Sequence, residues 1–239
     1  MEKNKICDRA RILLIDSDEN ICYLLRRLMR KENYKMYMAA SGRQGMEMAT
    51  GVCPDLIIMD IRLEDMDGTE LIKWFRKWTD CPVLVISERS SYVDKVNALY
   101  AGADDYLVKP FHEQELMARI YSALRRRLPS KVNSFYRAGE LCIDFSRRLV
   151  CISGEEIHFS PVEYRILECL AQNSGAVVTY QMLLDKIWGP YAESNSRILR
   201  VNMTNIRKKI DQSTIQTGYI TTIPRVGYRM IENQLETVG

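Results

Sequence analysis

The segment Pro54-Asp55-Leu56-Ile57-Ile58-Met59-Asp60 places four consecutive apolar residues directly before an acidic residue. A short, uninterrupted apolar run is typical of a strand buried on both faces, as in a parallel sheet. In open sheets of this kind ligands bind beyond the carboxyl ends of the strands. Asp60 therefore lies at the end of the strand where such sheets bind their ligands.

The same alternation of short apolar runs and longer amphipathic stretches extends over residues 1–128. The predicted strands are 12–15, 34–38, 56–59, 83–86 and 105–108. The predicted helices are 19–30, 43–50, 69–77, 92–100 and 113–127. Five such units predict an α/β domain with a doubly wound, five-stranded parallel sheet.

The chain changes character after residue 128. A polar linker is predicted at 129–134, followed by a second domain over 135–239. Short strands are expected near 137 and at 141–145, 149–152 and 157–159, helices at 161–172, 180–188 and 194–211, and a hairpin of 219–223 and 228–231. Three helices and a terminal hairpin predict an α+β winged helix.

Composition narrows the classes of function. The 239 residues contain no apolar stretch of the length, about 18 residues, that a spanning helix requires. The N-terminus does not look like a signal peptide, which predicts a cytoplasmic protein without a membrane partner. Seven scattered cysteines indicate reduced thiols, and only two histidines are available for a zinc site or a catalytic triad.

Charge is distributed unevenly along the chain. The formal net charge is only +3, yet the stretch 197–229 contains seven basic residues and the single acidic residue Asp211. A basic patch on an otherwise balanced protein indicates nucleic-acid binding rather than enzymatic activity.

Polar side chains follow four of the predicted strands. In chain order they are Asp16, Ser17, Asp18, Asp60, Ser87 and Lys109. Carboxylates that converge in one crevice require a cation, and an all-oxygen set suits Mg²⁺. A carboxylate nucleophile can accept a phosphoryl group, whose oxygens the hydroxyl and the ammonium would stabilise.

The predicted helix 194–211 combines an apolar face with a basic and polar one. Ile198, Val201, Ile206 and Ile210 are expected to face the core. The polar set consists of Arg197, Arg200, Asn202, Thr204, Asn205, Arg207 and Lys208. Such side chains read base edges in the major groove and neutralise phosphates, so double-stranded DNA is the expected partner.

The chain resembles bacterial two-component response regulators over nearly its whole length. The matching residues are 54–60, Met66-Asp67-Gly68, 82–87 and 102–111, together with the apolar strand into Asp16. The resemblance implies a flavodoxin-like receiver domain that a sensor histidine kinase phosphorylates on Asp60. It further implies Asp16, Asp60 and the Arg62 carbonyl as Mg²⁺ ligands, Ser87 and Tyr106 as switch residues, and Lys109 as the phosphate-contacting lysine.

One departure from that pattern concerns the metal site. The family usually has two adjacent acids after the first strand, and Ser17 occupies the second position. Mg²⁺ binding should then be weakened unless Asp18 contributes. An alternative hypothesis is a regulator of the same fold that binds DNA independently of phosphorylation.

A remote alternative is a haloacid-dehalogenase-type phosphatase that uses Asp16 as its nucleophile. Asp16-Ser17-Asp18 resembles the D-x-D motif of those enzymes. That interpretation leaves Asp60 and the second domain unexplained.

The second domain resembles the winged-helix domain of the OmpR/PhoB subfamily. Supporting motifs include Ser160-Pro161-Val162-Glu163-Tyr164, Asn173-Ser174-Gly175 and Gly227-Tyr228-Arg229. The resemblance implies that the polar set of helix 194–211 faces DNA and that Arg225 and Arg229 belong to the wing. Residues 81–90 and 199–203 look like the subtype that regulates potassium-transport operons.

The same resemblance implies a homodimer formed through the receiver domain. The matching charged residues are Lys95, Asp104, Asp105, Glu115 and Arg119. RNA polymerase is a further partner consistent with the family.

Overall fold

The computed structural model describes residues 10–126, 134–189, 196–213 and 218–234. The chain divides into two compact units, Met1–Arg127 and Leu128–Gly239. The predicted linker 129–134 lies outside the described residues except for Ser134, as do the first two residues of the predicted helix 194–211. Within the described parts of the chain, no helix is long and apolar enough to cross a bilayer.

The first unit contains the predicted five-stranded parallel sheet, in the order β2-β1-β3-β4-β5. Its strands are β1 (Arg11–Ile15), β2 (Lys35–Ala39), β3 (Leu56–Met59), β4 (Val83–Ser87) and β5 (Asp105–Val108). Its helices are α1 (Glu19–Lys31), α2 (Gly42–Val52), α3 (Gly68–Arg76), α4 (Tyr92–Ala101) and α5 (Glu113–Arg126). The structure confirms the doubly wound α/β prediction, with boundaries shifted by at most two residues.

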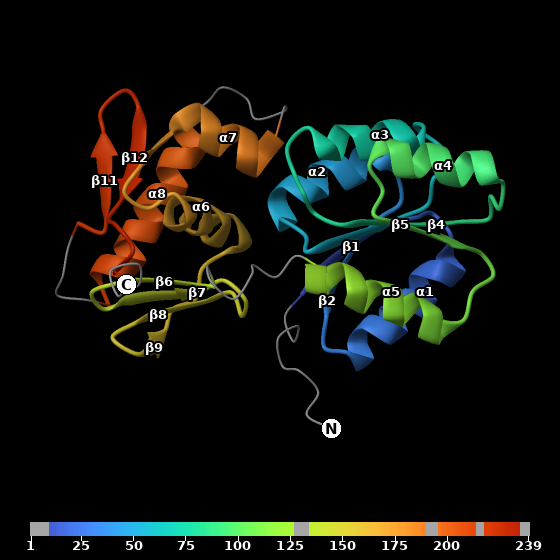
Figure 1. Cartoon of the computed structure of the whole chain (residues 1–239), viewed down its shortest axis with the longest axis horizontal. Coiled ribbons are helices and arrows are strands. Elements are labelled where there is room, and N and C mark those ends of the chain that lie inside the picture. Colours follow the sequence, from blue (N-terminus) through green and yellow to red (C-terminus); the bar gives the residue numbers. More distant parts are fainter. Residues whose placement is uncertain (1–9, 127–133, 190–195, 214–217, 235–239) are drawn as a thin grey trace. The chain divides into compact units, whose positions relative to one another are not determined.

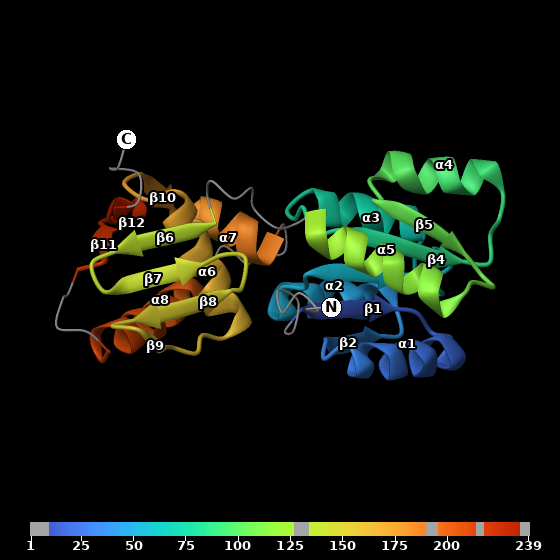
Figure 2. The ribbon, with the colours of Figure 1, turned by 60° about the horizontal axis from the view of Figure 1, so that its bottom comes forward.

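Helices cover both faces of this sheet (Figures 1 and 2). Alternate residues of β1 point to opposite sides, so Leu13 lies in the cluster beneath α2, α3 and α4. Leu14 lies in the other cluster, with Leu25 of α1 and Leu116 of α5. This burial on both faces explains why the strands are continuous apolar runs, and it leaves the carboxyl ends of the strands as the place for polar groups.

The second unit is a winged helix, which confirms the α+β prediction. Its antiparallel sheet, in the order β6-β7-β8-β9, consists of β6 (Phe135–Ala138), β7 (Leu141–Asp144), β8 (Leu149–Ile152) and β9 (Glu155–Glu156). The helices are α6 (Pro161–Gln172), α7 (Tyr180–Trp188) and α8 (Ser196–Asp211). A second sheet, β10-β12-β11, adds the unpredicted β10 (Val177–Thr179) to the hairpin β11 (Ile220–Ile223) and β12 (Gly227–Met230).

The prediction of a strand at 157–159 is wrong, because the last strand of the four-stranded sheet is β9, which ends at Glu156. Ser153 and Gly154 both have positive φ, 53° and 88°, as a tight two-residue hairpin turn requires. This turn pairs Ile152 directly with Glu155 and so ends the strand early. Phe159 instead packs against the core of the unit.

The predicted core face of α8 is also partly wrong. Ile198 and Val201 are 47% and 53% exposed, whereas Leu199 and Met203 are 0% and 1% exposed. The buried set Leu199, Met203, Ile206 and Ile210 has steps of four, three and four residues, which keep to one helical face more closely than the predicted set. Two apolar side chains therefore lie on the outward face of α8.

Candidate functional site

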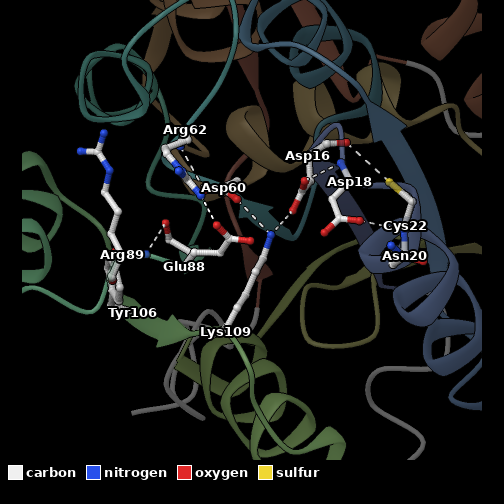
Figure 3. Close-up of polar contacts among 11 residues, drawn as sticks. Asp16, Asp18, Asn20, Cys22, Asp60, Arg62, Glu88, Arg89, Tyr106 and Lys109 are labelled. Atoms are coloured by element: carbon white, nitrogen blue, oxygen red, sulfur yellow. Dashed lines mark hydrogen bonds and ion pairs between the residues drawn. The ribbon is translucent and has the colours of Figure 1, made fainter.

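Two carboxylates and one ammonium meet at the carboxyl end of the parallel sheet (Figure 3). Asp16 follows β1, Asp60 follows β3 and Lys109 follows β5. The Lys109 Nζ donates to Asp16 Oδ2 at 3.0 Å and to Asp60 Oδ2 at 2.9 Å. The structure therefore brings together three of the predicted site residues in what we call the acidic pocket.

The acidic pocket carries more negative than positive charge. Asp16 and Asp60 are 4% and 8% exposed, and burial raises the pKa of the Asp16 carboxyl above its ordinary value. Although burial alone would lower the pKa of Lys109, its hydrogen bonds to both acids raise it. A single ammonium compensates only one of the two carboxylates, so the pocket is suited to a second cation.

Asp18 and Ser17 are placed less favourably for a metal. The Asp18 carboxylate caps α1 by accepting the Asn20 N–H at 2.9 Å, and Ser17 is exposed. Within the described residues, no three acidic, histidine or cysteine side chains form a metal-binding group. Asp16 and Asp60 still supply hard oxygen ligands of the kind that suits Mg²⁺, which retains several waters.

The loop after β3 folds tightly around Asp60. The Arg62 N–H donates to Asp60 Oδ1 at 3.0 Å, and the Gly68 N–H donates to the Ile61 carbonyl at 3.1 Å. A Cβ at Gly68 would lie 2.6 Å from that carbonyl oxygen, so only glycine permits this approach. The Arg62 guanidinium pairs with Glu88, next to the pocket.

Ser87 and Tyr106 are connected through the backbone of Arg89. The Arg89 N–H donates to Ser87 Oγ at 3.4 Å, and the Tyr106 hydroxyl donates to the Arg89 carbonyl at 2.9 Å. Ser87 is completely buried, and burial raises the pKa of Tyr106. The sequence pattern indicated both side chains but not the peptide that joins them, because Arg89 lies outside the strands.

The polar residues of α8 differ in how far they are exposed. The exposed ones are Arg197, Arg200, Thr204, Asn205 and Lys208. Asn202 is partly buried, and its amide donates to the Ile198 carbonyl at 2.8 Å. The exposed face of α8 therefore combines basic, amide and hydroxyl groups with apolar Ile198 and Val201, a mixture suited to base edges and phosphates.

Arg207 connects α8 to the wing, which is the hairpin of β11 and β12, instead of extending into solvent. Its guanidinium donates to the Ile220 carbonyl at 2.9 Å and to Thr222 Oγ1 at 2.8 Å, and it lies 5.5 Å from the centre of the Tyr228 ring. Of the predicted DNA-binding residues, Arg207 thus stabilises the packing of the wing against α8. Arg225 and Arg229 are exposed.

Lys209, next to the predicted Lys208, has a structural position that the sequence pattern did not indicate. Its Nζ donates to Glu163 Oε2 at 2.6 Å and to the His158 carbonyl at 3.0 Å. Glu163 is 5% exposed and completes the capping box of α6 with Ser160. Burial opposes the charged form of Glu163, but the hydrogen bonds from Lys209 and Ser160 leave its pKa below the ordinary value.

Four of the five predicted dimer residues form contacts within the chain. Arg119 donates to Asp105 and to Glu115, both at 2.8 Å. Asp104 accepts from Arg76 and from the Val83 N–H, also at 2.8 Å. Lys95 is partly buried on α4.

Comparison with known proteins agrees with this architecture. Residues 12–121 match the response regulator receiver domain, and residues 154–230 match the C-terminal domain of transcriptional regulatory proteins. The KDP operon transcriptional regulatory protein KdpE of Escherichia coli is 36% identical, covering 92% of this chain and 98% of the relative. The cell cycle response regulator CtrA of Brucella anthropi is 33% identical, covering 95% and 97%.

Among solved structures, the chain is similar to the response regulator DrrB of Thermotoga maritima, an OmpR/PhoB homologue. It is 27% identical, with a TM-score of 0.46, and the match covers 93% of this chain and 99% of that one. The two family models match this chain in one order, a receiver followed by the C-terminal domain of transcriptional regulatory proteins. The chain therefore belongs to the two-component response regulators that carry a C-terminal transcriptional regulatory domain.

Proposed function

We propose that Asp60 is the phosphoacceptor of this response regulator and that phosphorylation controls DNA binding by α8 and the wing. The acidic pocket is the observation that supports this proposal. In it, Lys109 Nζ lies 2.9 Å from the Asp60 carboxylate, where it would contact a phosphoryl oxygen. The family to which the chain belongs favours this function over the phosphatase alternative built on Asp16.

In the proposed reaction a carboxylate oxygen of Asp60 attacks the phosphorus of a phosphohistidine on the sensor kinase. The P–N bond to the kinase histidine breaks, and an aspartyl phosphate forms. Lys109 stabilises the transferred oxygens by charge. Ser87 and Tyr106 are the proposed switch residues, because their shared contact with Arg89 lets a change at one reach the other.

Receiver domains generally use Mg²⁺ at the phosphorylation site. Asp16, Asp60 and the Arg62 carbonyl are the ligands proposed for it here, with Asp18 as an additional candidate that would first have to leave its helix cap. The ion would supply positive charge that offsets the phosphoryl oxygens.

The deciding experiment is the intact mass of the full-length protein after incubation with Mg²⁺ and a small phosphodonor. One added phosphoryl group is expected, and Asp60→Asn should remove it. Asp55→Asn is a matched control, because Asp55 also adjoins β3 but pairs with Arg11 away from the pocket. An adduct that persists in Asp60→Asn would contradict the assignment.

A second candidate is regulation without phosphorylation. Ser17 in place of an acid and the capping role of Asp18 favour it, because they leave only two carboxylates in the pocket. It predicts no adduct under conditions that modify a control receiver, and weak Mg²⁺ binding in a titration. Mg²⁺ affinity equal to that of the control would exclude it.

For the output we propose a homodimer that binds double-stranded DNA in the cytoplasm. Lys95, Asp104, Asp105, Glu115 and Arg119 are the proposed interface residues. RNA polymerase is a proposed further partner, and potassium-transport genes are the proposed targets, supported by the KdpE relatives. Binding to paired half-sites should be tighter than to single ones, and equal affinity would count against the dimer.

A further inference from the structure

Two cysteines lie directly opposite each other on neighbouring strands of the second unit. The register of β7 and β8 pairs Cys142 with Cys151, and both are free thiols of intermediate burial. Leu141, Ile143 and Val150, which alternate with them along the strands, are buried in the core. Because successive side chains of a strand point to opposite faces, the two thiols lie on the outer face of the sheet.

The backbone determines how far apart the two cysteines are. The Ser153 N–H donates to the Glu140 carbonyl at 3.1 Å, so Glu140 and Ser153 form a hydrogen-bonded pair. Hydrogen-bonded and non-hydrogen-bonded pairs alternate along an antiparallel ladder. Cys142 and Cys151 lie two positions further along and therefore form the next hydrogen-bonded pair. The Cα atoms of such a pair lie about 5.5 Å apart, within the range of about 4.4–6.8 Å found in disulfides. The Cα separation is therefore compatible with a disulfide between the two cysteines.

The same geometry makes that bond reversible. Directly opposed Cβ atoms lie about 4.5–5.5 Å apart, whereas disulfides bring them to about 3.5–4.5 Å. The strands must approach slightly, and a disulfide under strain is more easily reduced than a structural one.

The two cysteines are partly exposed, and their neighbours on the adjacent strands are exposed. Arg137 of β6 lies opposite Cys142, and Glu156 of β9 lies opposite Cys151, and both of these flanking residues are exposed. Burial, the thiol of Cys142 and the carboxylate of Glu156 raise the pKa of Cys151.

Other cysteines of the described residues are placed differently. Cys53 and Cys81 are each 2% exposed, and Cys169 is 4% exposed. Cys22 is partly buried in the first unit, where its thiol donates to the Asp16 carbonyl at 3.5 Å. The strand registers place only Cys142 and Cys151 opposite each other.

We propose that Cys142 and Cys151 form a reversible disulfide, an oxidative modification site on the outer face of the four-stranded sheet. With hydrogen peroxide as oxidant, one thiolate attacks a peroxide oxygen, the O–O bond breaks, and a sulfenic acid and hydroxide form. The second thiol attacks the sulfenic sulfur and releases water. Overall, the two thiols lose two electrons and two protons, and the peroxide becomes two waters.

The reverse reaction uses thiol–disulfide exchange. Two molecules of a low-molecular-weight thiol reduce the bond and leave as their own disulfide. The proposal concerns the thiols of the second unit alone and does not depend on phosphorylation of Asp60.

The experiment treats the folded, full-length protein with peroxide, alkylates the remaining thiols and digests with trypsin. Cleavage after Arg137, Arg147, Arg148 and Arg165 separates the cysteines into peptides 138–147 and 149–165, each with one cysteine. The expected product is these two peptides joined, two hydrogens lighter than their sum, and separated again by excess glutathione. Cys142→Ser should abolish the joined product, and the matched control Cys22→Ser should retain it.

A second measurement tests whether the fold creates the site. The joined product should form about tenfold faster, or more, in the folded chain than in urea, because the strands hold the thiols together. Equal rates would overturn the proposal. Complete alkylation of both cysteines after peroxide, or joining of either one to a different cysteine, would also overturn it.

Discussion

Two lysines that contact buried carboxylates, one in each unit, show how an ion pair at a ligand site differs from one that stabilises the fold. Lys109 is shared by two buried carboxylates, Asp16 and Asp60. Lys209 contacts a single buried carboxylate, that of Glu163. The first arrangement leaves one negative charge uncompensated, whereas the second is neutral. An unbalanced buried charge destabilises the fold unless a ligand supplies the missing cation, so imbalance marks the site where a ligand binds.

The largest expected effect is on phosphorylation. Lys109→Met should slow formation of the phosphoryl adduct by about 100-fold, as is typical when a group that stabilises charge is removed. Intact mass measured over time gives the rate. Lys209→Met should leave that rate unchanged, and a similar loss in both variants would erase the distinction between the two lysines.

The next largest effect is on the stability of the second unit. Glu163→Gln should lower its free energy of unfolding by about 2 kcal/mol, because it leaves Lys209 without its ionic partner. Hydrogen-exchange mass spectrometry of the full chain reports each unit separately. In the double variant Glu163→Gln/Lys209→Met part of the loss should be recovered, and strictly additive losses would show that the pair is not coupled.

The same pair predicts a dependence on pH. Because the pKa of folded Glu163 lies below its ordinary value of 4.5, the carboxylate stabilises the folded state above that value. The contribution is lost as the pH falls from 4.5 through the lower pKa of the folded state. Acid unfolding of the wild type and Glu163→Gln should therefore converge below this window, and a constant difference between them would contradict the assignment.

A smaller effect of opposite sign is expected in the acidic pocket. Asp60→Asn removes the uncompensated charge, so the free energy of unfolding of the first unit should rise by about 1 kcal/mol. Added Mg²⁺ should stabilise the wild type more than this variant. A destabilised Asp60→Asn would mean that the pocket is balanced like the Glu163 and Lys209 pair.

The smallest effect concerns the wing, where Arg207 supports the fold and Arg225 is exposed. Arg225 has a φ of 65°, a conformation that costs a residue with a side chain about 1 kcal/mol or more. Arg225→Gly should stabilise the wing by a few tenths of a kcal/mol to about 1 kcal/mol and reduce the salt dependence of DNA binding by about one charge. Binding measured across salt concentrations would show an unchanged slope if Arg225 makes no phosphate contact.

The sequence predicted the positions of the pocket residues because they depend on a local signal. Each of Asp16, Asp60 and Lys109 follows an apolar strand, and parallel strands end at one edge. Lys209 could not be assigned in this way, since its partner lies on another helix, 46 residues away. Ile198 and Val201 were misplaced because α8 contains more apolar residues than its buried face accommodates.

The last described residues complete the first strand of their own unit. Asn233 and Gln234 accept the outward N–H groups of Arg137 and Gly139 at 3.1 and 2.8 Å, and the Tyr136 hydroxyl donates to the Ile231 carbonyl at 3.0 Å. During synthesis the first unit can fold once its own residues have left the ribosome. The edge of β6 stays unpaired until residues 233 and 234 have been translated, so this unit cannot close before its last described residues have left the ribosome.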